Sequence, residues 1–464
     1  MNNLADKDVL IIGAGPAGLS AGYELARSGL RVTILEKSGA IGGLCRTTSF
    51  GGCLFDVGPH RFFTDNKEIE KLWRDLLGDN FNKVPRLTRI FYRQKYFSYP
   101  VKPFEVLTNL GLKTSTEVMW SYFKTLISGR RKQPKNHEEW ISQNFCPKLF
   151  QMFFKNYTEK VWGIPCTQIE AEWADERIKN LSFWSTLKHA LGFKRQEIRS
   201  LIEEFDYPRL GTGMMYEAIA KIILDQGGRI VFNQTVNEIK YQNQEILCVM
   251  SRDDAGQITE WPADYFFSSM PLTASIKRLT PAPPAEIEAA AQALYFRAHI
   301  SVNLILKRPN FFPDNWIYIH EPSIKMARVA NYANFSSAAA PNHVSPISCE
   351  YFVFKDDAIW QKADEELKNL AIDELGKLFK LKPEEIADGY VNREEFAYPV
   401  YYIGYQEPYD KLKNYITAFN NFQPIGRGGM YRYFNQDQAI LTGLLAARNL
   451  LGDKNNLWQV GVKK

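Results

Sequence analysis

The chain has 464 residues, 45% of them hydrophobic and 23% charged, which is enough for two or three packed regions and ordinary for a globular enzyme. A net charge of +5 suits an anionic small-molecule ligand but is too weak to predict nucleic-acid binding. The six cysteines are scattered without a CxxC pair, so we expect reduced thiols, no metal site and a cytoplasmic protein. We find no signal peptide and no run of about 18 apolar residues, so we expect no membrane span.

The first segment, "DVLIIGAGPAGLSAGYELARSGLRVTILEK", predicts a strand, a glycine turn, a helix and a second strand. Gly13, Gly15 and Gly18 form GxGxxG where the first strand meets the helix. In this motif the glycines allow a tight turn, a close approach to a pyrophosphate and close packing of helix on strand. The second strand ends in Glu36, whose carboxylate can accept both hydroxyls of an adenosine ribose. Together these features predict dinucleotide binding, whereas GxGxxG alone could be a flexible turn.

The next glycine pattern, "GAIGGLCRT" at residues 39–47, indicates which dinucleotide binds. It resembles the second signature of the FAD-binding fold shared by amine oxidases, protoporphyrinogen oxidase, phytoene desaturases and UDP-galactopyranose mutases. The resemblance implies that Gly42 and Gly43 lie against the FAD pyrophosphate with Arg46 beside it. It also implies noncovalent FAD, because no Cys or His occupies a position that the superfamily uses for flavin attachment. The alternative is a glycine-rich surface turn.

The stretch "GPHRFFTDN", residues 58–66, narrows the resemblance. Bacterial UDP-galactopyranose mutases carry a similar Gly-Pro-His-x-Phe-x-Thr-Asp-Asn segment, which implies that His60 lies next to the flavin. Arg61 departs from the pattern, because the mutases have an aliphatic residue there. A core histidine satisfied by backbone groups is the alternative.

Three segments in the middle of the chain also resemble the mutases. "FFKNYTEKVWGIP" implies that Tyr157 and Trp162 lie on the uridine side of the substrate pocket. "EWADERIKNL" resembles the eukaryotic enzymes and implies that Arg177 contacts the substrate diphosphate. "MARVANYANFS" implies that Arg328 reaches the sugar phosphate. Trp162 as an ordinary core residue is the alternative at that position.

The carboxy-terminal third contains "AYPVYYIG" and "IGRGGMYRYFNQD". The resemblance implies that Tyr398 and Tyr433 donate hydroxyls to the diphosphate and that Arg427 lies by the flavin. Phenol and guanidinium groups bind a pyrophosphate without offering a competing base. We expect Asp437 to cap the helix that follows, whose positive end the resemblance aims at the flavin pyrimidine ring. A tyrosine cluster that serves only packing is the alternative.

These patterns predict an α/β fold in which a doubly wound, Rossmann-type FAD-binding domain carries an inserted helical domain and an antiparallel-sheet substrate domain. We expect the FAD-binding domain in residues 1–98, 205–280 and 415–464, the helical domain in 99–204 and the sheet domain in 281–414. We expect two strands in residues 227–253 and an amphipathic pair of helices in residues 355–379.

Two functions remain open. The resemblance implies a mutase of cell-surface polysaccharide biosynthesis that interconverts pyranose and furanose forms of a UDP-hexose through an adduct at N5 of reduced FAD. His60, Arg177, Arg328 and Arg427 would be its catalytic residues, a nucleotide sugar its substrate, and NADH or NADPH its reductant. The alternative is an FAD-dependent oxidase or desaturase, and a non-catalytic FAD-binding scaffold is a third. A homo-oligomer is one of the open oligomeric states.

Overall fold

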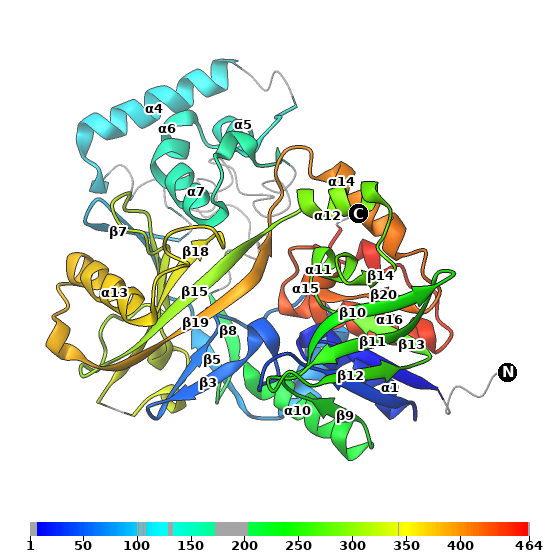
Figure 1. Ribbon diagram of the computed structural model, residues 1–464. Helices are drawn as coiled ribbons and strands as arrows, with labels where there is room; N and C mark the ends of the chain where they lie inside the picture. The colour runs from blue at the N-terminus through cyan, green and yellow to red at the C-terminus, as the bar shows by residue number, and fades with distance from the viewer. Residues whose placement is uncertain are drawn as a thin grey trace.

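The fold is built around two large sheets that lie beside each other, with helices on their outer faces (Figure 1). The computed structural model describes residues 7–99, 101, 105, 108–128, 133–171, 203–341 and 343–462. The predicted fold class is confirmed, because a parallel sheet, a mostly antiparallel sheet and a group of helices are all present.

The parallel sheet has five strands in the order β20-β13-β1-β2-β9. Their bounds are β1 Asp8–Ile12, β2 Arg31–Leu35, β9 Arg229–Val231, β13 Tyr265–Ser268 and β20 Phe422–Pro424. Alternate residues of β1 enter two different cores, because successive side chains of a strand point to opposite faces. Val9 and Ile11 pack against three helices, whereas Leu10 and Ile12 pack on the other face. The three helices are α1 Pro16–Arg27, α10 Gly213–Asp225 and α16 Gln436–Leu450.

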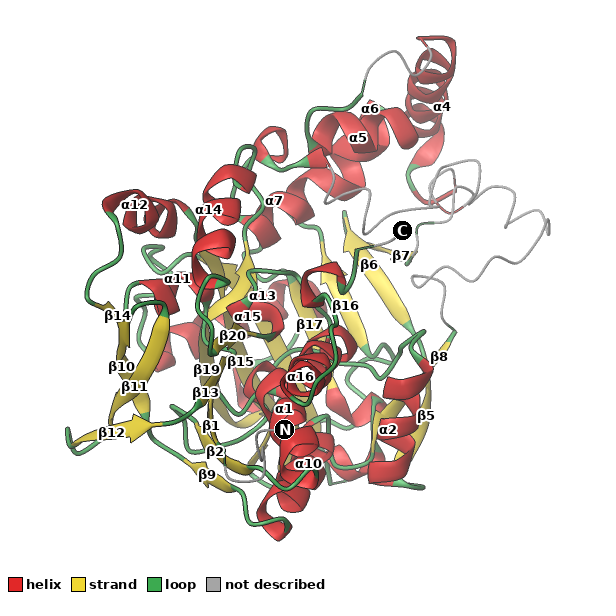
Figure 2. Ribbon diagram, turned by 90° about the vertical axis from the view of Figure 1, so that its right-hand side faces the viewer, coloured by secondary structure: helices red, strands yellow, loops and turns green. Residues whose placement is uncertain are grey.

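The other face of the parallel sheet is covered by a second sheet and by short helices (Figure 2). The sheet has the order β12-β11-β10-β14. Its strands are β10 Thr235–Gln242, β11 Glu245–Arg252, β12 Ile258–Pro262 and β14 Leu279–Thr280, and the helices are α11 Leu272–Ile276, α12 Ala285–Ala293 and α14 Gln406–Ile416. The expectation of two strands in residues 227–253 is wrong, because β9 pairs with β2 as a third strand there.

The large mixed sheet has seven strands in the order β19-β15-β18-β17-β16-β6-β7. They are β6 Thr88–Tyr92, β7 Lys95–Ser98, β15 Phe296–Leu306, β16 Trp316–Ile319, β17 Arg328–Asn331, β18 Ser345–Val353 and β19 Ile386–Pro399. Every neighbouring pair is antiparallel except β16 with β6. The predicted range 1–98 of the FAD-binding domain thus includes two strands of this sheet, and the domain boundaries stay a prediction.

Helix α13, Asp364–Phe379, covers the far face of this sheet. A pair of helices was expected in residues 355–379, but only one forms. The Glu366 carboxylate accepts a hydrogen bond of 3.0 Å from the Ala363 amide and so starts the helix there. The preceding residues form turns, the first of which is closed by the Asp357 carboxylate on the Phe354 amide at 2.7 Å. The side chains of Glu366 and Asp357 therefore limit the segment to one helix.

A group of helices rises from the end of the large sheet (Figures 1 and 2). It contains α4 Gly111–Ser128, α5 His137–Asn144, α6 Pro147–Leu149, a π-helical segment Phe150–Lys155 and α7 Asn156–Trp162. The Arg297 side chain of β15 donates to the Val161 and Lys160 carbonyls at 3.1 and 3.3 Å. Because these carbonyls end α7, the arginine fixes this helix to the large sheet.

The remaining elements lie between the parallel sheet with its helices and the large mixed sheet. They are α2 Lys67–Leu77, α15 Gly426–Gly429, the hairpin of β3 Thr47–Phe50 with β4 Cys53–Asp56, and the pair of β5 Phe81–Pro85 with β8 Glu204–Pro208. Short 3-10 turns lie at Gly43–Cys45, Cys166–Gln168, Tyr332–Asn334, Ser337–Ala339, Pro383–Glu385 and Leu457–Gln459. Among the described residues, no helix is both long and apolar enough to cross a membrane.

Candidate active site

The first glycine turn lies between β1 and α1, as the sequence predicts. Gly13 has φ of +99° and donates to the Leu35 carbonyl at 2.7 Å, which ties the turn to β2. A Cβ atom on Gly18 would lie 1.9 Å from the Gly13 carbonyl oxygen. Only glycine therefore lets α1 start this close to β1, and the amino terminus of α1 faces the space beyond the turn.

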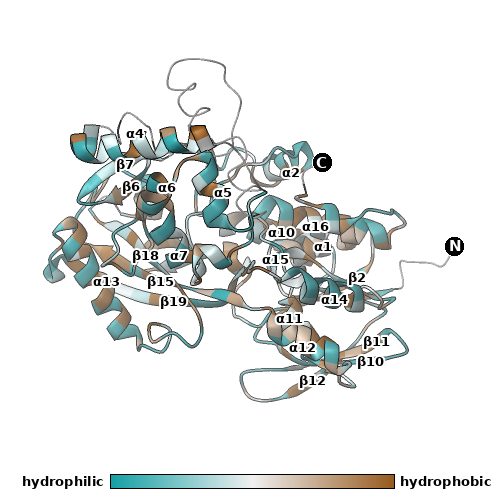
Figure 3. Cartoon of the chain, turned by 90° about the horizontal axis from the view of Figure 1, so that it is seen from above, coloured by the Kyte–Doolittle hydropathy of each residue, from teal (hydrophilic) through white to brown (hydrophobic). Residues whose placement is uncertain are grey.

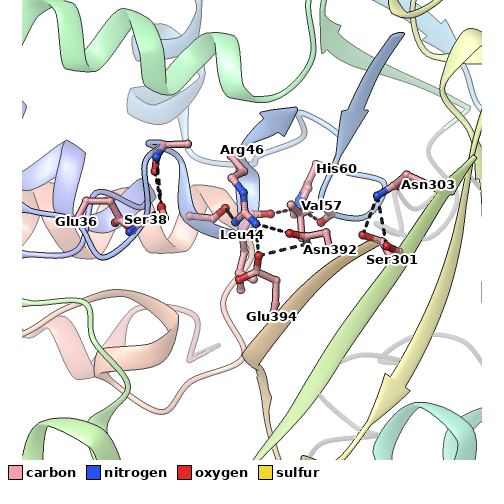
Figure 4. A network of polar contacts seen from close by, with 12 residues as sticks. Glu36, Ser38, Leu44, Arg46, Val57, His60, Ser301, Asn303, Asn392 and Glu394 are labelled. Carbon is pink, nitrogen blue, oxygen red and sulfur yellow. Dashed lines mark hydrogen bonds and ion pairs between the residues drawn. The ribbon is translucent and has the colours of Figure 1, made fainter. Parts of the chain in front are cut away.

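Glu36 lies at the carboxyl end of β2 and closes the other side of this turn. One carboxylate oxygen accepts from the Ala14 amide at 2.8 Å, and the other accepts from the Ser38 amide and hydroxyl at 2.9 and 2.8 Å (Figure 4). Glu36 is 7% exposed and lines the cavity described below. These contacts fix the carboxylate in one orientation, and the oxygen that accepts from Ala14 keeps a further lone pair for a hydroxyl.

The second glycine turn packs directly on the first. Gly42 and Gly43 have φ of +94° and +53°, and the Gly42 amide donates to the Ala14 carbonyl at 2.8 Å. A Cβ atom on Gly43 would lie 3.2 Å from the Gly15 Cα atom. The backbones of both turns thus meet without side chains between them, which lets a pyrophosphate approach them closely.

Arg46 follows the second turn and reaches the large sheet. Its guanidinium donates to the Gly43 carbonyl at 2.9 Å and to the Asn392 side chain at 2.6 Å, and it forms an ion pair with Glu394 (Figure 4). Arg46 thereby links the glycine turn to β19. The sequence did not predict Asn392 and Glu394 as partners.

His60 is held by two backbone carbonyls. Its Nε2 atom lies 2.8 Å from the Leu44 oxygen and 3.1 Å from the Val57 oxygen. Because carbonyls only accept, Nε2 carries a proton, and Nδ1 faces the Cys45 sulfur at 4.0 Å. Burial disfavours the charged ring, but Cys45 and the buried Asp56 carboxylate outweigh burial and raise the pKa of His60 to about 9. His60 lines the cavity as an imidazolium at neutral pH.

Arg328 lies on β17 and is held by a carboxylate that the sequence did not point to. Its Nε atom donates to Glu350 at 2.7 Å, and Nη2 donates to the second oxygen of the same carboxylate. His299 Nε2 lies 2.9 Å from Glu350 as well. Glu350 is fully buried, and although burial opposes its charge, Arg328 and His299 lower its pKa to about 2. The fork-to-fork pair fixes the Arg328 guanidinium rigidly.

Arg427 lies against the two tyrosines that the sequence grouped with it. Its guanidinium carbon lies 4.4 Å from the Tyr398 ring centre and 4.3 Å from the Tyr433 ring centre. Trp162 contacts both tyrosine rings, with centroids 6.3 and 5.9 Å away. Arg427 Nη1 donates to the Phe434 carbonyl at 3.1 Å, whereas its buried Nε has no partner among the described residues. That orphaned donor marks the cluster as a place for an acceptor.

Tyr157 stacks on His320, with ring centres 4.8 Å apart and planes 11° apart. Burial, and then the charge of Lys160, lower the pKa of His320 to about 3, so its ring is neutral. Lys160 donates to the carbonyls of Ile319, Met326 and Glu321 at 2.9, 3.1 and 3.2 Å, which holds α7 on the loop after β16. The sequence offered no signal for His320 or Lys160, because their partners lie more than 150 positions away.

One cavity of about 1480 Å³ joins these groups. The predicted residues that line it are Gly13, Gly15, Glu36, Gly43, His60, Tyr157, Trp162, Arg328, Tyr398, Arg427 and Tyr433. The predicted residues Gly18, Gly42, Arg46 and Asp437 are not among its lining residues. Single ligands usually occupy about 300–1,000 Å³, so the volume suits a dinucleotide together with a second small molecule. Arg177 lies outside the described residues.

Asp437 does not cap α16, contrary to the expectation from the sequence. The helix begins at Gln436, and the side chain of Gln438 accepts from the Asn435 amide at 3.0 Å, which makes Asn435 the capping position. Asp437 lies within the first turn and accepts from the Thr64 hydroxyl at 3.0 Å. It therefore joins α16 to the loop that carries His60.

Asp56 is a further residue that the sequence did not single out. It is 2% exposed and accepts from the hydroxyls of Thr47, Tyr207 and Thr212 at 2.6, 2.7 and 2.7 Å. These bonds join the hairpin β3–β4 to the turn before α10. No group of three or more His, Cys, Asp or Glu among the described residues is arranged to hold a metal ion.

Comparisons with known proteins agree with this geometry. The profile of the family described as flavin containing amine oxidoreductase matches residues 16–451. The L-amino acid oxidase bordonein-L of Crotalus durissus terrificus is 25% identical over 403 residues, which cover 82% of this chain and 73% of that protein. The Klebsiella pneumoniae protein named "Probable UDP-galactopyranose mutase" is 28% identical over 180 residues, which cover 37% of this chain and 44% of that protein.

Solved structures extend the likeness to nearly the whole chain. Reduced UDP-galactopyranose mutase superposes with a TM-score of 0.83 at 20% identity, over 98% of this chain and 97% of that one. A putrescine oxidase bound to putrescine superposes with a TM-score of 0.64 at 16% identity, over 97% and 99% of the two chains. At these identities the likeness shows a shared fold.

Proposed function

We propose that this chain, which belongs to the family of flavin-containing amine oxidoreductases, is a flavin-dependent mutase that interconverts pyranose and furanose forms of a UDP-hexose. The observation that carries the proposal is the Arg427 cluster. Arg427 lies against the rings of Tyr398 and Tyr433, whose centres are 5.4 Å apart, and all three line the cavity that also contains both glycine turns. Such a set of cationic and phenolic donors suits a diphosphate beside a flavin.

The glycine turns and Glu36 fit FAD. The two turns pack closely, since a Cβ atom on Gly43 would meet Gly15 at 3.2 Å, and the Glu36 carboxylate is preoriented for a ribose hydroxyl. When bound, FAD supplies the reactive centre for the sugar, and the protein supplies binding, orientation and charge. We propose that FAD is held noncovalently, that its reduced form is active and that NADH or NADPH reduces it.

The protein's own groups would act on the diphosphate and the sugar. Glu350 holds Arg328 in one orientation, so the arginine contributes a preorganised charge at little entropic cost. Arg427 packs against its two tyrosine rings, and its buried Nε has no hydrogen-bond partner among the described residues. Such fixed donors stabilise charge on a departing diphosphate and hold it for its return. This chemistry needs no nucleophilic Ser or Cys.

The remaining expectations accompany this proposal. Tyr157, stacked on the neutral His320, would lie on the uridine side together with Trp162. Arg177 would be a further diphosphate ligand. We propose a cytoplasmic enzyme of cell-surface polysaccharide biosynthesis, with a homo-oligomer as one of its open states.

An oxidase or desaturase is the second candidate, and one observation favours it. Glu350 offsets the charge of Arg328, and both residues line the cavity. The walls of the cavity are thus less cationic than the count of arginines indicates, which suits a less anionic substrate. The relative bordonein-L is named as an oxidase.

UDP binding by the FAD-loaded protein separates the two candidates. Arg427→Ala is expected to weaken UDP binding by about 2–4 kcal/mol, because it removes charge-assisted hydrogen bonds in a partly desolvated site. Tyr398→Phe is expected to cost about 1 kcal/mol for one neutral donor, and added salt is expected to weaken binding. The control is Arg252→Ala, an exposed arginine of β11. Titration calorimetry gives these values. No UDP binding together with peroxide release from an amine would establish the oxidase instead.

A further inference from the structure

Helix α4 presents an apolar stripe to the outside of the molecule. Six large apolar side chains on it are between 49% and 86% exposed, and these are Leu112, Met119, Trp120, Phe123, Leu126 and Ile127. At 3.6 residues per turn they all fall within a sector of about 120°. The buried Ser115 adjoins one edge of the stripe, and the buried Val118 lies further round the helix from that edge. Helix α4 lies at the outer edge of the helical group (Figures 1 and 3). It is therefore attached through the side that carries Val118 and leaves the stripe exposed.

A stripe of this kind marks an interaction surface. Single exposed apolar residues are common, but contiguous apolar patches on an exposed helix are where proteins bind partners or lipid. In α4 the stripe extends over about four turns, and the Trp120 and Phe123 rings stack with centroids 6.0 Å apart. Lys124 Nζ lies 5.2 Å from the Trp120 ring centre. Tryptophan and lysine side by side are typical of helices that lie at the depth of lipid head groups.

A basic cleft lies along one flank of the same helix. Its volume is about 390 Å³, and its charged lining residues are Arg93, Lys113, Lys148 and Glu117. Lys148 is paired with Glu117 at 2.5 Å, so one carboxylate faces three cations. An excess of positive charge beside an apolar stripe is complementary to a surface that is anionic outside and apolar inside.

Part of the stripe also lines the large cavity, and this position limits what can cover the stripe. Met119, Phe123 and Leu126 are exposed on α4 and also line that cavity. A protein partner, including a second copy of this chain, would cover the cavity at these residues when seated on the stripe. An apolar stripe beside an excess of positive charge instead matches a bilayer, which is apolar inside and anionic at its surface. We propose that α4 and its basic cleft bind the surface of an anionic lipid bilayer, with α4 lying in the plane of the head groups.

Vesicle flotation of the FAD-loaded protein tests the proposal. We expect the protein to float with vesicles of phosphatidylcholine and phosphatidylglycerol, to bind pure phosphatidylcholine more weakly, and to be released partly by salt. This outcome does not depend on which substrate the cavity takes, so it can fail or succeed separately from the proposed mutase activity.

Variants that leave the cavity intact give the decisive comparison. Trp120 and Ile127 belong to the stripe but do not line the cavity. Trp120→Gln together with Ile127→Gln is expected to weaken vesicle binding at least about tenfold, because neither position would then bury an apolar side chain in the bilayer. The control is Leu224→Gln on α10, where the leucine is 52% exposed outside the stripe, and it is expected to bind like the wild type. Retained flavin absorbance shows that each variant is folded.

A second measurement reports insertion directly. Lipids brominated in their tails are expected to quench part of the tryptophan emission of the wild type, and Trp120→Phe is expected to abolish that part. The proposal is wrong if the wild type floats with neither vesicle or if the double variant floats as well as the wild type. It is also wrong if the double variant only abolishes self-association seen by sedimentation, because the stripe would then be a contact between two copies.

Discussion

Glu350 fixes the orientation of the Arg328 guanidinium towards an anion, since the two residues form a buried ion pair beside the cavity. Removing one partner of such a pair leaves an uncompensated charge and typically costs about 3–5 kcal/mol. We therefore expect Glu350→Gln to lower the free energy of unfolding by about 3 kcal/mol, measured by urea titration. The control is Glu365→Gln, whose own side chain is 77% exposed although it pairs with the partly buried Lys368, with an expected change below about 0.5 kcal/mol. An equally small effect at both positions would contradict this role of Glu350.

The same pair predicts a dependence of stability on pH. The folded pKa of Glu350 is lowered from 4.5 to about 2 by Arg328 and His299, against the opposing effect of burial. A carboxyl group with a lowered folded pKa stabilises the fold fully above its unfolded pKa and loses this contribution as the pH falls towards the folded value. The difference in unfolding free energy between wild type and Glu350→Gln is thus expected to shrink between pH 4.5 and about 2. A difference that stays constant over this window would refute the assignment.

His60 is expected to act on the flavin through its charge. Its pKa of about 9 keeps it positive at neutral pH, and a positive group beside the ring favours the anionic reduced flavin. His60→Ala is expected to lower the two-electron midpoint potential by about 30 mV or more, which corresponds to about 1.4 kcal/mol. Spectroscopic redox titration measures this, with His343→Ala at the exposed His343 as the control. An unchanged potential in folded His60→Ala would leave His60 a purely structural histidine.

At the scale of elements, the contact of the two glycine turns is the feature that the cofactor site depends on. Gly43 and Gly52 both have positive φ, +53° and +77°. A Cβ atom on Gly43 would meet Gly15 at 3.2 Å, whereas one on Gly52 would meet nothing within 4 Å. Alanine at either position costs about 1 kcal/mol of backbone strain, so Gly52→Ala is a matched control.

We expect Gly43→Ala to weaken FAD binding at least about tenfold and Gly52→Ala to leave it unchanged, because only the former separates the two turns. Equilibrium dialysis of FAD against the apoprotein measures both constants. Equal FAD affinity of the two variants would show that close contact between the turns does not matter for binding.

The elements that could be predicted are those whose signals are local. The strand, glycine turn, helix and second strand of residues 8–36 follow from apolar runs and spacing, and all of them form. The predicted cap at Asp437 and the predicted pair of helices in residues 355–379 were wrong, because the start of a helix depends on which backbone amide meets which side chain. Glu350 and Glu394 were missed for a different reason. Their partners lie 22 and 348 positions away, and only the assembled sheet brings them together.

At the scale of the whole molecule, the two ends of the chain build one sheet. β1 pairs with β13, which in turn pairs with β20, and α1 packs on α16. Residues within 88–98 and 296–399 form the strands of the large sheet, residues within 111–162 form the group of helices at its end, and the cavity is lined by residues of both large sheets and of these helices. This arrangement places the Arg427 cluster, which comes from the carboxy-terminal end, in the same cavity as the first glycine turn.

The most direct test of the proposed function is turnover of a sugar nucleotide. The FAD-loaded protein is photoreduced without oxygen and incubated with UDP-galactofuranose, and the products are separated by chromatography. We expect UDP-galactopyranose to form with the reduced protein and not with the oxidised protein, and we expect Arg427→Ala to slow its formation by about 2–4 kcal/mol in activation free energy. Recovery of unchanged UDP-galactofuranose from the reduced protein, together with peroxide release when the oxidised protein meets an amine, would contradict the mutase.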